Sequence, residues 1–219
     1  TPARFPLSLY DEVALPSLTR LVEAVHRFDT RFGIQLWDGG TQAGGTVHLS
    51  PSGISSRAAA VHDARAPRPE GRALSEADVV QVIGYFADAA ERCVRAGFDF
   101  VEIHAGHGYL ISAFLSSHFN RRNDRYGGSF ENRCRFLLEI LRAVKDRVGA
   151  AHTVGVKING DDFLPEGGWV LEDACQVAPL LEAEGADYLS VTAGVMGGTR
   201  LTVPPLYKKQ GCFADMAQA

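Results

Sequence analysis

The stretch FDFVEIHAGHGY, residues 98–109, decides how this chain folds and where its chemistry lies. Its first half is apolar enough to form a buried strand, and it runs directly into His104, His107 and Tyr109. A buried strand ordinarily ends in turn residues, so polar rings at this point indicate a site at the carboxyl end of the strand. Parallel sheets, open or closed, bind their ligands at that end.

The composition is that of an ordinary soluble globular protein, with 219 residues of which 46% are hydrophobic and 22% charged. The net charge of −4 comes from interspersed acidic and basic residues, so no basic field favours nucleic acid. No apolar run approaches the roughly 20 residues that span a bilayer, and the N-terminus lacks a basic segment followed by an apolar one. We therefore expect a cytoplasmic protein without nucleic-acid or membrane partners.

The four cysteines lie far apart and form no C-x-x-C pair. This spacing argues against a zinc ribbon, a local redox pair or an iron–sulfur cluster. Two of them also fall within predicted helices among apolar neighbours. We expect all four to serve packing: Cys93, Cys134, Cys175 and Cys212.

Helical periodicity alternates along the chain with short strand-like runs, which is typical of repeated parallel β/α units. One helix begins at Ser75, with Asp78 three residues on as a variant of the capping box, and ends at Gly97. The other predicted helices cover about 17–28, 130–148 and 171–184, and the predicted strands cover 33–37, 98–104, 154–159 and 187–192. Residues 38–74 are too long for an ordinary connection and are predicted to be functional or covering; residues 105–128 form a second loop, and the chain is irregular after Gly194.

The two faces of the predicted strands differ, because successive side chains point to opposite sides of a sheet. One face is aliphatic, and we expect helices to cover it: Ile34, Leu36, Val101, Ile103, Val154, Val156, Ile158, Leu189 and Val191. The other face is polar toward the strand ends: Gln35, Trp37, Glu102, His104, Lys157, Asn159, Ser190 and Thr192. Buried polar groups are costly unless they are paired or used, and a barrel interior with an active site in its upper layer explains them.

Each of these polar groups also has a plainer interpretation. His104 and His107 suit a metal, but no H-E-x-x-H pattern or third ligand accompanies them, and they suit the satisfaction of buried carbonyls as well. Lys157 is suited to a buried ion pair, to stabilising negative charge on a ring, or to both. The amide of Gln35 fits the edge of a heterocycle and equally a structural hydrogen bond.

Beyond these patterns, the chain resembles the old yellow enzymes and the related NADH:flavin oxidoreductases, which include bacterial 2,4-dienoyl-CoA and 2-enoate reductases. The resemblance rests on the continuous run AGFDFVEIHAGHGYLISAFLSSHFNRRNDRYGGSFENRCRFLLEI, residues 96–140. GIQLWDGG at 33–40, PSGI at 51–54, VGVKINGDDF at 154–163 and the PPLY and QG pieces near residues 204 and 210 support it in order along the chain. The combination of H-x-x-H-G-Y-L with N-R-R-x-D-x-Y-G-G-S-x-E-N-R is highly specific.

The resemblance implies a TIM-type (β/α)8 barrel that holds FMN at the carboxyl ends of its strands and takes reducing equivalents from NADH or NADPH. It implies an ene-reductase, in which His104 and His107 bind the oxygen of an α,β-unsaturated carbonyl or acyl substrate. Tyr109 then corresponds to the proton donor to the α-carbon, and Gln35 and Lys157 to contacts of the flavin ring. A flavin-dependent amine demethylase or dehydrogenase, and a vestigial barrel fragment that acts through protein contacts, remain alternatives.

The chain differs from the family pattern at two positions and matches only part of the family's barrel. Asp38 and Thr41 stand where the family usually has a histidine and an arginine. Matched to the family, residues 1–219 form a single partial barrel domain, of about four strands, without the first two and last two strands. We expect either missing barrel segments or a homo-oligomer to complete it.

Overall fold

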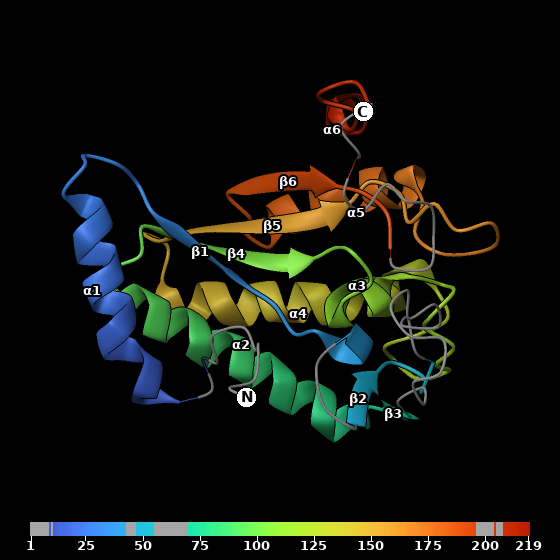
Figure 1. Cartoon of the computed structure of the whole chain (residues 1–219). Helices are drawn as coiled ribbons and strands as arrows, with labels where there is room; N and C mark the ends of the chain where they lie inside the picture. The colour runs from blue at the N-terminus through green and yellow to red at the C-terminus, as the bar shows by residue number, and fades with distance from the viewer. Residues whose placement is uncertain (1–8, 10, 43–46, 55–69, 196–203, 205–207) are drawn as a thin grey trace, which may run out of the picture.

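The computed structural model describes residues 9, 11–42, 47–54, 70–195, 204 and 208–219. Within this part, four parallel strands form one sheet in the order β1-β4-β5-β6 (Figure 1). The strands are β1 (Gly33–Leu36), β4 (Phe100–Ala105), β5 (Thr153–Asn159) and β6 (Tyr188–Thr192). The four predicted strands are confirmed, and their bounds differ from the predicted ones by at most two residues.

Four long helices alternate with these strands, as the periodicity predicts. They are α1 (Leu15–His26), α2 (Glu76–Ala96), α4 (Phe130–Val148) and α5 (Leu171–Ala183). Figure 1 shows α2 and α4 running together along one face of the sheet, and the two helices pack against each other. Each strand, helix and next parallel strand form one β/α unit, so the α/β class is confirmed.

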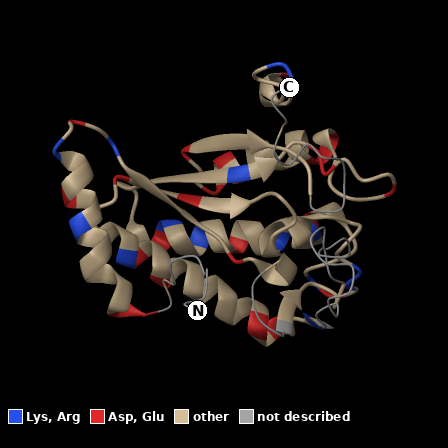
Figure 2. Ribbon diagram, in the orientation of Figure 1, with Lys and Arg blue, Asp and Glu red and all other residues tan. Residues whose placement is uncertain are grey.

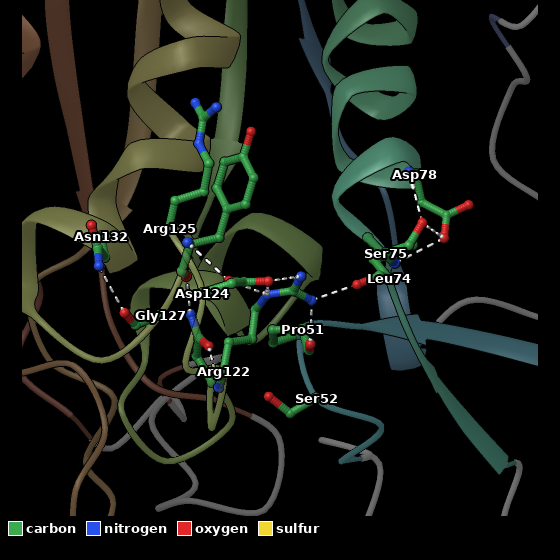
Figure 3. Close-up of polar contacts among 12 residues, drawn as sticks. Pro51, Ser52, Leu74, Ser75, Asp78, Arg122, Asp124, Arg125, Gly127 and Asn132 are labelled. Atoms are coloured by element: carbon green, nitrogen blue, oxygen red, sulfur yellow. Dashed lines mark hydrogen bonds and ion pairs between the residues drawn. The ribbon is translucent and has the colours of Figure 1, made fainter.

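Local signals in the sequence set the ends of α2. The Ser75 hydroxyl accepts a hydrogen bond from Asp78 N at 3.1 Å, and the Asp78 carboxylate accepts one from Ser75 N at 2.9 Å (Figure 3). Together these bonds form a capping box and satisfy amide groups that the first turn leaves without partners. At the other end Gly97 adopts a φ of 96°, which glycine tolerates best.

The aliphatic face of the sheet packs on the helices and forms the core. Val101 and Ile103 of β4 and the aliphatic residues of β5 are buried there. Leu189 is an exception, because this residue is 38% exposed. The expectation that helices cover the whole face is therefore wrong at β6, which is an edge strand of the sheet, while α5 packs against β5.

The cysteines divide into two pairs. Cys93 of α2 and Cys134 of α4 are buried in the core, and burial raises the pKa of each thiol to about 12. Cys175 and Cys212 are exposed. The packing role is thus confirmed for the first pair and wrong for the second, whose side chains are exposed.

Two segments predicted as loops contain regular structure. The 38–74 segment includes η2 (Gly40–Gln42) and a parallel two-stranded sheet of β2 (Val47–Ser50) and β3 (Glu70–Ala73), while residues 43–46 and 55–69 lie outside the described part. The 105–128 segment includes α3 (Leu110–Leu115), all of whose residues are buried. A short helix buried on every side shows no amphipathic period, so sequence patterning does not reveal it. Short elements also flank the chain, η1 (Glu12–Ala14) and α6 (Ala214–Gln218).

Arg122 fastens the long loop after β4 to the small β2–β3 sheet. Its Nη1 donates to the carbonyl oxygens of Pro51, at 2.8 Å, and Leu74, at 2.5 Å (Figure 3). Its Nε donates to the Asp124 carboxylate at 2.9 Å. The Arg122 side chain is only 9% exposed, so these bonds satisfy a nearly buried guanidinium and hold the loop after β4 against Pro51 and Leu74.

Among the helices within the described ranges, none combines the length and the apolar character needed to cross a bilayer. The cytoplasmic location and the extent of the domain over residues 1–219 stay predictions.

Candidate functional site

The inner face of the sheet begins with a layer in which glycines and aromatic rings alternate from strand to strand. The Phe100 ring lies over Gly33 and the Tyr188 ring over Gly155, since a Cβ on either glycine would come within 2.1 Å of the neighbouring ring. The two rings meet edge to face, with their centroids 6.1 Å apart. This aromatic layer is the floor on which the polar groups above it stand.

A charged layer lies directly above this floor. Gln35 and Glu102 are register partners on β1 and β4, and Gln35 Nε2 donates to Glu102 Oε1. Lys157 Nζ lies 3.6 Å from the same carboxylate oxygen and donates to Ser190 Oγ at 2.6 Å. Figure 2 shows the acidic segment of β4 and the basic segment of β5 within the sheet. The ion pair predicted for Lys157 is therefore present, and one carboxylate joins Gln35 to Lys157.

The ends of the strands bring the three predicted rings together. The ring centroids of His104 and His107 are 5.1 Å apart, those of His104 and Tyr109 5.0 Å, and those of His107 and Tyr109 6.3 Å. Lys157 is the register partner of His104 on β5. The three rings thus occupy the carboxyl rim next to Lys157. Gln35 lies one register level lower and connects to Lys157 through Glu102.

His104 is a neutral imidazole whose tautomer follows from its surroundings. Burial lowers its pKa to about 3, and the charges of His107 and Lys157 contribute to the same shift. Its Nδ1 accepts a hydrogen bond from Gly106 N at 3.1 Å. A neutral ring that accepts at Nδ1 carries its proton on Nε2. His104 therefore offers an N–H donor at Nε2.

The turn after β4 holds His107 in an uncommon backbone conformation. His107 has a φ of 60°, in the left-handed region that non-glycine residues rarely adopt. Asn159 Oδ1 accepts a hydrogen bond from its backbone N at 3.0 Å, and Gln42 Nε2 donates to its carbonyl oxygen at 2.8 Å. On the side chain, Nε2 lies 2.7 Å from Thr192 Oγ1. Three segments from different parts of the chain thus aim this ring at the rim.

The electrostatics keep this ring neutral too. Burial, and after it the charge of Lys157, lowers the pKa of His107. Gly106 allows the close approach that the turn requires, since a Cβ there would lie 2.9 Å from Asn159 Oδ1 and from a Thr192 methyl carbon. The rim therefore offers a pair of uncharged imidazoles beside one ammonium group.

Tyr109 completes the rim from the start of α3. Its ring packs against that of Trp37, with centroids 4.6 Å apart, so the phenol is held between β1 and the histidines. Burial raises the pKa of Tyr109. The phenol consequently keeps its proton at neutral pH and can donate it.

Sequence patterning does not single out Asp162, a buried acid that contacts Asn159 next to the rim. Its buried carboxylate accepts hydrogen bonds from Asn159 Nδ2 at 2.8 Å and from Trp169 N at 3.0 Å. Burial raises its pKa to about 6. The only hint in the sequence is the position of this acid directly after a strand end. Through Asn159 it is connected to the backbone of His107.

Asp38 and Thr41, the two departures from the family pattern, belong to the turn after β1. Asp38 Oδ1 accepts a hydrogen bond from Gly40 N at 2.8 Å, and its carbonyl oxygen accepts one from Leu110 N at 3.0 Å. Thr41 lies in η2 and is buried. Asp38 thus shapes the turn, where the family pattern has larger basic side chains.

The described residues contain no group of three or more His, Cys, Asp or Glu side chains placed to hold a metal ion. The histidine pair is instead surrounded by donors and by the ammonium of Lys157. A cation next to an imidazole pair disfavours a second cation at the same place.

Comparisons with known proteins identify relatives of this chain. The chain is 36% identical over 220 residues to an NADH oxidase of Thermoanaerobacter brockii and 35% identical over 213 residues to an NADPH dehydrogenase of Listeria welshimeri, covering 97% of this chain in both cases. Among solved structures it is similar to a 2-naphthoyl-CoA reductase, with a TM-score of 0.85, 27% identity and 97% of this chain covered. It is also similar to morphinone reductase in complex with tetrahydroNAD, with a TM-score of 0.75, 28% identity and 96% covered.

These relatives are longer than this chain. It spans 32% of the NADH oxidase, 60% of the NADPH dehydrogenase, 33% of the 2-naphthoyl-CoA reductase chain and 59% of the morphinone reductase chain. The neighbours are TIM barrels of the old yellow enzyme type, so the four-stranded sheet is part of the predicted barrel fold. The profile of the NADH:flavin oxidoreductase / NADH oxidase family matches residues 4–196, and the chain therefore belongs to this family.

Proposed function

We propose that this chain provides the flavin-ring and substrate-oxygen contacts of an FMN-dependent ene-reductase, which acts on an α,β-unsaturated carbonyl or acyl compound. The family to which the chain belongs implies FMN as cofactor, with NADH or NADPH as reductant. One observation carries the more specific proposal. Two neutral imidazoles and a protonated phenol share one rim of the sheet, beside a lysine and above an amide.

The donor set of the inner face fits the ring of FMN. An isoalloxazine has carbonyl oxygens and ring nitrogens along one edge, and its reduction adds negative charge there. Lys157 can place an ammonium group against such an edge, and Gln35 keeps a carbonyl oxygen and a second N–H besides the one given to Glu102. When bound, FMN supplies the hydride that the protein side chains cannot provide.

The histidines suit the oxygen of the substrate. A neutral His104 donates from Nε2, and His107 lies beside it with its own orientation fixed by Thr192. Hydrogen bonds to a carbonyl oxygen withdraw electron density from the conjugated C=C and stabilise the negative charge that develops on the oxygen. These bonds make the β-carbon a better hydride acceptor.

Tyr109 suits the proton that the α-carbon needs. Its phenol is protonated at neutral pH because burial raises its pKa, and its ring is held by Trp37. A positioned acid of this kind contributes typically 10²–10⁴-fold to the rate of proton transfer. The hydride at the β-carbon and the proton at the α-carbon together complete the reduction of the double bond.

Amine oxidation is the second candidate, because the chain is also similar to a histamine dehydrogenase, with a TM-score of 0.74 and 28% identity. The charge at the rim favours the first candidate. An ammonium at Lys157 repels a cationic amine, whereas it attracts the oxygen of an electron-poor carbonyl. Turnover of 2-cyclohexenone compared with N-methylated amines distinguishes the two.

Separating the two half-reactions tests the proposal. In anaerobic stopped-flow experiments, NADPH or NADH bleaches the flavin of the FMN-loaded protein, and 2-cyclohexenone then restores its colour. Tyr109→Phe keeps the packing on Trp37 and is expected to slow the second step by about 10²-fold or more while the first step stays within about twofold. Tyr85→Phe, on the exposed side of α2, is the matched control. Equal slowing of both steps, or of neither, would refute the role of Tyr109.

A further inference from the structure

Glu102 is a largely buried charge that the proposed chemistry leaves without a role. Its side chain is 13% exposed, and it points from β4 into the charged layer between Gln35 and Lys157. A carboxylate in such a place offsets part of the positive electrostatic potential that its lysine partner produces nearby. Charged groups are rarely buried unless paired, and this pair lies directly beside the rim.

Three polar groups surround this carboxylate. Gln35 Nε2 donates to Oε1, and Lys157 Nζ lies 3.6 Å from the same oxygen. From the aromatic floor, Tyr188 also interacts with it: after burial, the charge of Glu102 and a hydrogen bond with its carboxylate raise the pKa of Tyr188. The Glu102 carboxylate thus lies between an amide donor, a phenol and an ammonium group.

Lys157 transmits this charge to the rim. Its ammonium acts on both imidazoles, because its charge is among the causes that lower the pKa of His104 and His107. It also donates to Ser190 at 2.6 Å, so its position is set by a hydroxyl on β6 and a carboxylate on β4. Any change in the charge of Glu102 therefore alters the field at the rim without removing a group that contacts a ligand there.

We propose that Glu102 is a positioning residue that sets the effective charge of Lys157 at the rim, and thereby the reduction potential of the flavin bound beside it. The flavin part rests on the proposed function. Reduction by NAD(P)H transfers two electrons and one proton as hydride, releases NAD(P)⁺ and adds one negative charge to the flavin. The Glu102 carboxylate opposes that added charge, while Lys157 stabilises it.

Glu102→Gln is the decisive variant, because its amide oxygen still accepts from Gln35 while the negative charge is lost. We expect the midpoint potential of bound FMN to rise by about 30 mV, which is a tenfold shift for a two-electron couple. Glu23→Gln, an exposed charge on α1, is the matched control and should leave the potential unchanged. A potential that stays the same or falls in Glu102→Gln, with FMN bound, would overturn the inference.

A second readout needs no flavin. In the flavin-free protein, NMR titration of the His107 imidazole should show a lower pKa in Glu102→Gln than in the wild type, because Lys157 then acts without its counter-charge. In the double variant Lys157→Met with Glu102→Gln, this effect should disappear relative to Lys157→Met alone. If FMN fails to bind even to the wild type, the proposed function fails, yet this titration still decides the coupling: an unchanged His107 pKa refutes it.

Discussion

Acidification should destabilise this protein through His104, and the size of the effect follows from its surroundings. The unfolded imidazole takes up a proton as the pH falls through about 6.5, whereas the buried ring, with a pKa of about 3, does not. The stability from the neutral ring is therefore fully present above pH 6.5 and is lost as the pH falls toward 3. One proton corresponds to about 1.4 kcal/mol per pH unit, or roughly 3 kcal/mol between pH 6 and pH 4.

Asp162 works in the opposite direction and partly hides this loss in the wild type. Its pKa is raised to about 6 from 3.8, so between these values the folded state holds a proton that the unfolded state has released. Its contribution is present at low pH and disappears as the pH rises through 6. The stability of the wild type alone is thus a poor test, and the comparison of variants is needed.

Urea unfolding at pH 7, 6, 5 and 4.5 provides the assay, with the free energy of unfolding from linear extrapolation. Relative to His104→Gln, the wild type should lose about 1.4 kcal/mol per pH unit below pH 6. Relative to Asp162→Asn, the wild type should gain about 1.4 kcal/mol of stability per pH unit as the pH falls below 6. A constant difference between wild type and His104→Gln across this range would refute the conclusion that His104 is neutral and buried.

Two further predictions concern the packing beneath and beside the rim. Gly155→Ala should lower the free energy of unfolding by about 1–3 kcal/mol, since the new Cβ would lie 2.1 Å from the Tyr188 ring; Gly84→Ala, in α2 where a Cβ meets open space, should not destabilise the protein in the same urea titration. Arg122→Met should make residues 47–54 exchange amide hydrogens faster than in the wild type, while exchange in β5 stays the same, because the variant loses the bonds to Pro51 and Leu74. Equal protection of this segment in variant and wild type would contradict the anchoring role.

Much of the fold could be predicted from local signals. The capping box at Ser75, the stop at Gly97 and the aliphatic alternation of β4 and β5 each depend on neighbouring residues, and the structure agrees with them. The polar inner face could be predicted for the same reason, because strand period alone places Glu102 and His104 on one side.

The remaining features depend on contacts between distant segments. α3 is buried on all sides and therefore shows no amphipathic period. β2 and β3 pair with each other across residues 51–69, so their short strands are not evident from the local sequence. The left-handed backbone of His107 depends on Asn159, 52 residues away. Asp162 acquires its raised pKa only when Trp169 and Asn159 enclose it. No window along the sequence contains these partners together.

Binding of a flavin ring without its phosphate tests the central claim most directly. Lumiflavin carries the isoalloxazine alone, so its affinity reports the contacts of Gln35 and Lys157 and no phosphate site. Titration of the flavin-free protein, followed by the flavin absorption band, should show saturable binding that Lys157→Met weakens at least tenfold, about 1.4 kcal/mol, and Glu23→Gln leaves unchanged. A wild-type binding curve without saturation would contradict the placement of a flavin at this rim. So would identical binding curves for the wild type and Lys157→Met.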